Sequence, residues 1–150
     1  MKLAEALIQR ADAKKRLEQL RQRLIRSAKV QEGDAAPENP QDLLSEMDGL
    51  VDELTSLIQR INRTNSSTAF DSNRSLTDIL AERDALMMRR SMLSSMMIAA
   101  QPQARYGRME IKETPTVSIA EMQKQYDELA RQHRELDTAI QQMNWTVDLV

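Results

Sequence analysis

Four long stretches of this sequence place an apolar residue at alternating spacings of three and four. In the last stretch the series is Ile119, Met122, Tyr126, Leu129, His133, Leu136, Ile140 and Met143. This spacing follows the turn of an α-helix, so each stretch has one apolar face that another helix must cover. The pattern therefore predicts an all-α chain with coiled-coil-like heptads.

Polar segments that contain glycine, proline, serine or asparagine interrupt this pattern and divide the chain into four helices. Ser75 followed by Asp78, and Ser118 followed by Glu121, are typical of helix starts with a capping box. The connections of about ten residues between the predicted helices favour antiparallel neighbours, and the third connection is longer. We expect an antiparallel four-helix bundle or helical hairpins, forming a single domain over residues 1–150. The predicted helices cover about residues 2–29, 40–63, 75–100 and 118–144.

Two segments outside the helices alternate apolar and polar residues, as strands do. The first is 108–117, with Met109 and Ile111, and the second is 145–149, which begins at Trp145. An isolated strand needs a partner. One expectation is that the two segments pair as a short two-stranded β element, within a chain or between chains. The equal alternative is that both are irregular extended segments packed on the helices.

The residue types exclude several kinds of chemistry. The sequence has no cysteine and a single histidine, which rules out disulfides, thiolate metal sites and the paired Glu-x-x-His pattern of di-iron bundles. We predict no catalytic residue, no metal and no cofactor. No run of 18 apolar residues predicts a transmembrane helix. The charged first residues lack the apolar core of a signal peptide, so we expect a cytoplasmic protein.

Charge is unevenly distributed along the first half of the chain. Residues 1–30 contain nine Lys/Arg and three Asp/Glu, whereas residues 31–60 contain one Arg and eight Asp/Glu. A basic helix can indicate nucleic-acid binding. However, aromatic residues, which stack on bases, make up only 3% of the chain, and the net charge is −2. We interpret the two blocks as complementary surfaces within or between subunits, and we expect no nucleic-acid partner.

Arginines stand within the apolar stripes at Arg10, Arg83 and Arg90. A buried guanidinium without a partner costs several kcal/mol. If consecutive helices are antiparallel, Arg83 lies level with Asp137, so these two residues should pair. Arg90 should reach one of two carboxylates, Glu53 or Glu128. The predicted polar layer consists of Arg10, Arg83, Arg90, His133, Asp137 and Asn62.

Two interpretations of this layer remain open. It is either a structural network that sets the register of the helices, or an anion site in which Arg10, Arg83 and Arg90 hold a phosphate or carboxylate in forked geometry. His133 lies on an apolar face, where a single histidine is more typical of a core residue than of a ligand.

The third predicted helix is apolar on two sides. Opposite its core stripe lie Ala85, Met88, Met92 and Met96. A helix that is apolar all round is buried all round, whereas a four-helix monomer covers only one face of each helix. We therefore expect a homo-oligomer whose interface includes these four residues. The alternatives are a groove for an unidentified protein partner and a membrane contact, which the lack of a Lys-rich polar face disfavours.

Five short segments carry a resemblance to a known family. They are "AKVQEGD" at 28–34, "INRTN" at 61–65, "LAERD" at 80–84, "EIK" with "PTV" at 110–117, and "NW" at 144–145. In this order they resemble a family of small bacterial proteins of unknown function, some labelled septicolysin. The resemblance covers nearly the whole chain, and "INRTN" followed by "LAERD" is its most specific part. It implies a bacterial origin, and the label implies a cytolysin, but no pore-forming or catalytic residue carries over.

Three functions follow from these observations, in order of preference. The first is a self-assembling structural or interaction module without catalytic activity. The second is an anion or small-molecule binder that uses the buried arginine layer. The third is a membrane-active, septicolysin-like protein. The residues themselves do not specify the biological role, the ligand or the number of subunits.

Overall fold

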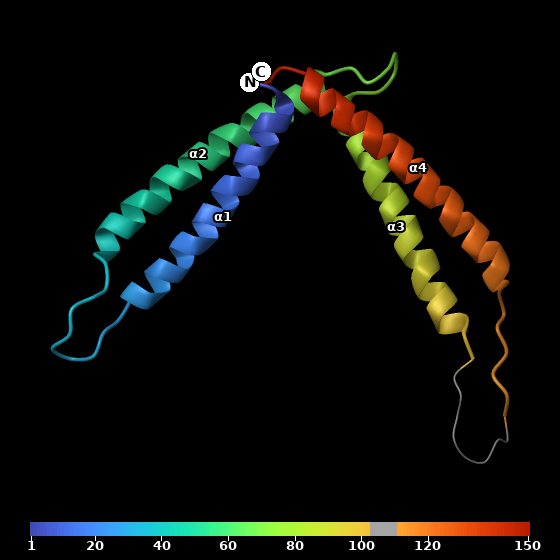
Figure 1. Cartoon of the computed structure of the whole chain (residues 1–150), viewed down its shortest axis with the longest axis horizontal. Coiled ribbons are helices and arrows are strands. Elements are labelled where there is room, and N and C mark those ends of the chain that lie inside the picture. Colours follow the sequence, from blue (N-terminus) through green and yellow to red (C-terminus); the bar gives the residue numbers. More distant parts are fainter. Residues whose placement is uncertain (103–110) are drawn as a thin grey trace. The chain divides into compact units, whose positions relative to one another are not determined.

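The computed structural model describes residues 1–102 and 111–150, and this part of the chain contains four long helices (Figure 1). They are α1 (Leu3–Ser27), α2 (Pro40–Ser67), α3 (Leu76–Ala100) and α4 (Ile119–Thr146). The prediction of an all-α fold is confirmed. Each helix begins within about one residue of its predicted start, because capping residues determine where the helical backbone begins.

The caps show how the sequence sets these boundaries. Asn39 precedes α2, and its side-chain oxygen accepts a hydrogen bond from the Gln41 amide at 2.9 Å. At the start of α3, the Ser75 amide donates to the Asp78 carboxylate at 2.7 Å, while the Ser75 hydroxyl accepts from the Asp78 amide. Such reciprocal bonds satisfy amides that the helix itself leaves unpaired.

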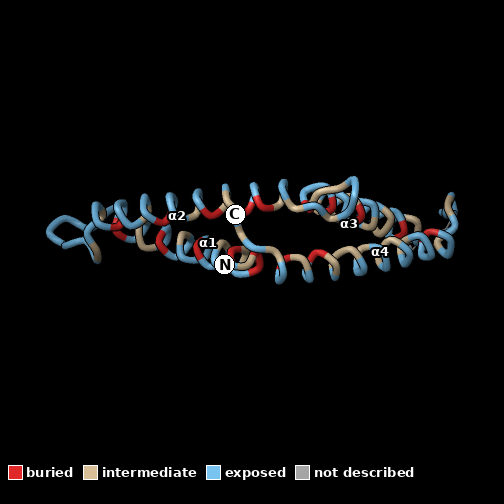
Figure 2. Tube along the Cα trace, turned by 90° about the horizontal axis from the view of Figure 1, so that it is seen from above, coloured by how far each residue is buried: buried red, intermediate tan, exposed pale blue. Residues whose placement is uncertain are grey.

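The chain divides into two compact units, and each is built on a helical hairpin. The first unit comprises residues 1–69 and 142–150, and the second comprises residues 70–141. In the first, α1 packs along α2; in the second, α3 packs along α4 (Figure 1). Buried positions recur along each helix between mostly exposed ones (Figure 2). The prediction that residues 1–150 act as one domain stays a prediction.

The first hairpin is joined by an apolar seam. Leu20 of α1 and Leu43 and Leu50 of α2 are buried together, and each buried leucine side chain contributes roughly 1.5–3 kcal/mol. Arg23 adds a polar link, since its guanidinium lies 2.7 Å from Glu38 and 3.2 Å from Glu46. The hydrogen bond from Arg23 lowers the pKa of Glu38 below its ordinary value. Part of the basic charge of α1 therefore faces acidic residues of its own hairpin.

Residues 1–3 and 146–150 form a second link in the first unit, which we call the terminal clasp. The Leu3 amide donates to the Val147 carbonyl, and the Leu149 amide donates to the Met1 carbonyl, both at 2.9 Å. Lys2 and Asp148 form an antiparallel bridge and an ion pair of 2.8 Å. The clasp therefore ties the end of α4 to the beginning of α1.

Thr64 anchors this clasp to α2. It is fully buried, and its hydroxyl donates to the Arg60 carbonyl at 2.9 Å and accepts from the Val150 amide at 3.0 Å. Arg60 also donates through Nε to the Val150 carbonyl at 3.2 Å. The clasp thus contacts α2 through a polar group that lies inside the protein.

Within one chain, the predicted β pairing of residues 108–117 with residues 145–149 is wrong for the described residues, and pairing between chains stays a prediction. Residues 111–117 form no strand, and Asp148 pairs with Lys2 instead. The beginning of the first segment, residues 108–110, lies outside the described residues. Alternation predicted an extended C-terminal segment, but a local pattern does not specify which distant backbone will bond to it.

Thr64→Val tests the anchoring hydroxyl, because it keeps the branched shape and removes the acceptor of the Val150 amide. Leaving that amide unpaired should lower the free energy of unfolding by about 1–2 kcal/mol. Amide exchange at Leu3 and Leu149 should become faster, as measured by NMR. Thr55→Val, at an exposed position of the same helix, should change neither quantity. Unchanged exchange in Thr64→Val would show that the hydroxyl does not hold the clasp.

Candidate functional site

The residues of the predicted polar layer are divided between the two units. Arg10 and Asn62 belong to the first unit, where Arg10 is half-buried and Asn62 is exposed. The second unit contains Arg83, Arg90, His133 and Asp137. A single layer that includes all six residues therefore stays a prediction, and the contacts described below concern the second unit alone.

Arg83 contacts the residue that the antiparallel levels predict. Its guanidinium lies 3.6 Å from the Asp137 carboxylate and 3.3 Å from Asp84. The side chains of Arg83 and Asp137 are 27% and 39% exposed, so the pair is half-buried rather than buried. Ion pairs with this much solvent contribute about 0–1 kcal/mol. The pair aligns α3 with α4 but supplies little of the stability of the hairpin.

Arg90 has a different partner from the carboxylates expected for it. Its guanidinium lies over the Tyr126 ring, 5.1 Å from the centroid, and donates to the Tyr126 hydroxyl at 3.3 Å. An aromatic face satisfies a cation without a carboxylate. Glu53 belongs to the other unit, and Glu128 bonds to Arg131 at 2.6 Å. Hydrogen bonds from Arg131, and then from Gln132, lower the pKa of Glu128 to about 2.

The seam between α3 and α4 contains the polar side chains of Arg90 and His133. Within the described residues, Arg90 Nε and His133 Nε2 are buried in it without a hydrogen-bond partner. Such groups weaken a packed seam, because each has lost water without regaining a bond. The same described residues include no cluster of His, Asp and Glu suited to holding a metal ion.

The opposite side of α3 carries the methionines predicted as an interface. Met88, Met92 and Met96 are 60%, 73% and 47% exposed, while Ala85 is half-buried. We call these four residues the methionine strip. On its other side α3 buries Leu76, Ile79, Leu86 and Met97. One apolar stripe of α3 is therefore covered by the hairpin, and a second is open.

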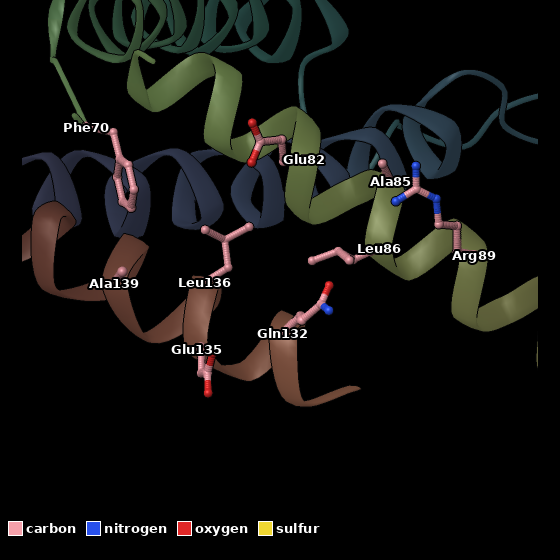
Figure 3. A pocket seen from close by; sticks show the side chains of 9 residues that line it. All are labelled: Phe70, Glu82, Ala85, Leu86, Arg89, Gln132, Glu135, Leu136 and Ala139. Atoms are coloured by element: carbon pink, nitrogen blue, oxygen red, sulfur yellow. The ribbon is translucent and has the colours of Figure 1, made fainter. Parts of the chain in front are cut away.

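A groove of about 550 Å³ follows the seam between α3 and α4 (Figure 3). It adjoins the methionine strip, because Ala85 belongs to both. Its apolar lining is Phe70, Ala85, Leu86, Leu136 and Ala139, and its polar rim is Glu82, Arg89, Gln132 and Glu135. The small side chains of Ala85 and Ala139 leave this space open. Sequence reasoning missed the groove, because the only signal was two alanines on separate helices.

One end of the groove is held by a network around Arg74. Its guanidinium lies 2.6 Å from Asp71 and 2.7 Å from Glu82, and 5.5 Å from the centre of the Phe70 ring. The bonds from Arg74 lower the pKa of Asp71, which favours its ionised form. Phe70 is thereby fixed at the end of the groove, close to Ala139 in the view of Figure 3.

Comparison with known proteins places the chain in a family. A family described as of unknown function, DUF6847, matches residues 10–149. The chain belongs to the DUF6847 family. A solved structure described as a functionally unknown conserved protein from Corynebacterium diphtheriae is similar to it, with 43% identity and a TM-score of 0.94. That alignment covers 100% of this chain and 99% of the other.

No curated protein matches this DUF6847 chain. The expected membership of a family of unknown function is confirmed, and neither similarity carries the septicolysin label. In residues 1–102 and 111–150, no helix is both long enough and apolar enough to cross a membrane.

The half-buried geometry of Arg83 and Asp137 sets the size of a testable effect. Arg83→Met should lower the free energy of unfolding by about 1 kcal/mol or less, because water still reaches both groups. Combining it with Asp137→Leu should reveal a coupling of roughly 0.2–1 kcal/mol in a double-mutant cycle measured by urea denaturation. Strict additivity would mean that the two residues do not interact in solution.

Proposed function

We propose that this DUF6847 protein is a self-assembling structural or interaction module without catalytic activity, and that the methionine strip of α3 is its interface. One observation carries the proposal. Met88, Met92 and Met96 are exposed in one line on a helix that already buries its other apolar stripe. An apolar line of this length on a charged chain marks an interaction site.

The energetics of a two-helix hairpin support assembly. A unit the size of residues 70–141 has a core that rarely supplies more than roughly 3–5 kcal/mol by itself. Here the seam also contains Arg83, Arg90 and His133, which pack less favourably than leucines. Burying each exposed methionine side chain would add roughly 1.5–3 kcal/mol. A second hairpin placed on the strip would form a four-helix bundle, in which each helix covers its apolar surface.

The surroundings of the groove support a non-catalytic role. Glu82 bonds to Arg74 at 2.7 Å, and Glu135 bonds to Arg131 at 2.6 Å. Both carboxylates on its rim therefore form exposed ion pairs with arginines, and among the described residues that line the groove neither is placed beside a nucleophile that it could activate. The polar groups of the rim better suit the solvated edge of an interface.

Met88→Glu with Met92→Glu tests the interface directly. Placing charges in the strip leaves the stripe of Leu86 and Met97 intact, so we expect a lower mass by sedimentation velocity and helicity that is kept or modestly reduced by circular dichroism. The matched control is Met87→Glu with Ile98→Glu, which adds the same charge to exposed apolar positions outside the strip. The control should retain the original mass.

Two results would contradict this proposal. An unchanged mass in the strip variant would show that the strip is not the interface. Loss of helicity in the strip variant, but not in the control, would show that the strip belongs to the core of the monomer.

A second candidate, an anion binder, is favoured by the buried and unpartnered Arg90 Nε and His133 Nε2. His133 is the only histidine of the chain, so the signal of its ring Hε1 proton can be assigned without ambiguity by NMR. Under our proposal, titration with inorganic phosphate should leave that signal without a saturable shift. A saturable shift that Arg90→Leu removes would instead support the anion site.

A further inference from the structure

The methionine strip begins at the groove and continues from it along α3. Ala85 belongs to both, since it begins the strip and lines the groove. Met96 lies 11 residues further along α3, which corresponds to about 16 Å at 1.5 Å per residue. The surface therefore has a hollow at one end, and Met92 and Met96, 73% and 47% exposed, at the other.

A surface of this kind is complementary to itself under a two-fold rotation. Two copies of α3 laid antiparallel bring the methionines of each copy over the groove of the other, as in an isologous dimer. With Ala85 opposite Met96 of the second copy, Arg89 lies opposite Met92 of that copy. A parallel arrangement would place groove against groove and methionine against methionine, which would leave both grooves unfilled.

We propose that the groove lined by Phe70, Ala85 and Leu136 is the socket for Met96 of a second copy of this chain, with the two α3 helices antiparallel. This inference rests on the proposed function, self-assembly through the strip, and specifies its register. Methionine suits the socket, because its unbranched, polarizable side chain fills irregular apolar space. Phe70, held by Arg74, closes the far end of the groove (Figure 3).

The available area suits a second hairpin as the occupant. Two helices of about 25 residues side by side offer a face about 37 Å long and about 18 Å wide. The product is roughly 700 Å² per copy, close to the roughly 800 Å² that each partner contributes to a standard stable interface. A short peptide bound in the groove would leave Met88, Met92 and Met96 uncovered, whereas a second copy covers them.

The proposed register brings two like charges close together. Arg89 is exposed and, within residues 1–102 and 111–150, forms no ion pair. The two-fold axis would pass between residues 90 and 91, so the two Arg89 side chains would emerge about 5 Å apart along the helix direction. Like charges at this separation oppose association. Arg89→Gln should therefore strengthen the dimer by about 2- to 10-fold, whereas Arg134→Gln, at an exposed position of α4, should not.

Disulfide crosslinking tests the register, and the chain is suited to it because it contains no cysteine. Ala85→Cys and Met96→Cys would be made as separate variants, mixed, exchanged and oxidised mildly. A disulfide requires Cα atoms about 4.4–6.8 Å apart. We expect the 85–96 heterodimer to dominate over the 85–85 and 96–96 homodimers, as measured by intact mass spectrometry.

Filling the socket provides an independent measurement. Ala139→Leu, on the groove wall, should weaken the dimer about 10- to 100-fold in Kd, because a larger side chain overpacks the contact. Ala120→Leu, at an exposed position of the same helix, should leave Kd unchanged. Circular dichroism of each variant would verify that the helices are retained.

The outcomes separate this inference from the proposed function. A native mass equal to the monomer would overturn both. A native oligomer that gives mainly 85–85 and 96–96 crosslinks, or no crosslink between positions 85 and 96, would overturn the antiparallel register and leave self-assembly standing. A predominant 85–96 crosslink, together with a weakened Ala139→Leu dimer, would support the socket.

Discussion

The packing of two helices along a single apolar stripe is the contact on which the rest of this structure depends. A helix pair covers one stripe of each helix and leaves the remaining circumference to solvent. In α3 the covered stripe includes Leu76, Ile79 and Leu86, while Met88 and Met92 remain exposed. Any apolar surface beyond the first stripe is consequently available to a partner, and this makes α3 the most informative helix for function.

The two hairpins solve the same packing problem with different chemistry. In the first, a leucine seam is reinforced by Arg23 at one end and by the terminal clasp at the other. In the second, Arg90 and His133 occupy the seam, and apolar side chains lie outside it. Polar side chains in the seam and methionines exposed to water both lower the stability of an isolated hairpin. The same arrangement becomes favourable when a further apolar surface covers the methionines and removes them from water.

The DUF6847 assignment and the similar Corynebacterium diphtheriae protein establish kinship without supplying a function. The function must therefore be inferred from the site itself. Phe70, Ala85 and Ala139 line a hollow, and Met92 and Met96 are exposed side chains further along α3. A hollow beside exposed methionines specifies more than exposed apolar area alone. In the proposed dimer it restricts both the side chain that fills the hollow and the orientation of the second copy.

Sequence alone was sufficient for the four helices, the methionine strip and the level at which Arg83 meets Asp137. All three follow from the spacing of residues along the sequence. The 3.6-residue turn decides which residues share a face of a helix, and capping residues decide where each helix begins. The partner of Arg90, the bond between Thr64 and Val150, and the hollow beside Ala85 were decided only by the tertiary structure. Each depends on how far and at what rotation two separate segments approach, and local spacing carries no information about that distance.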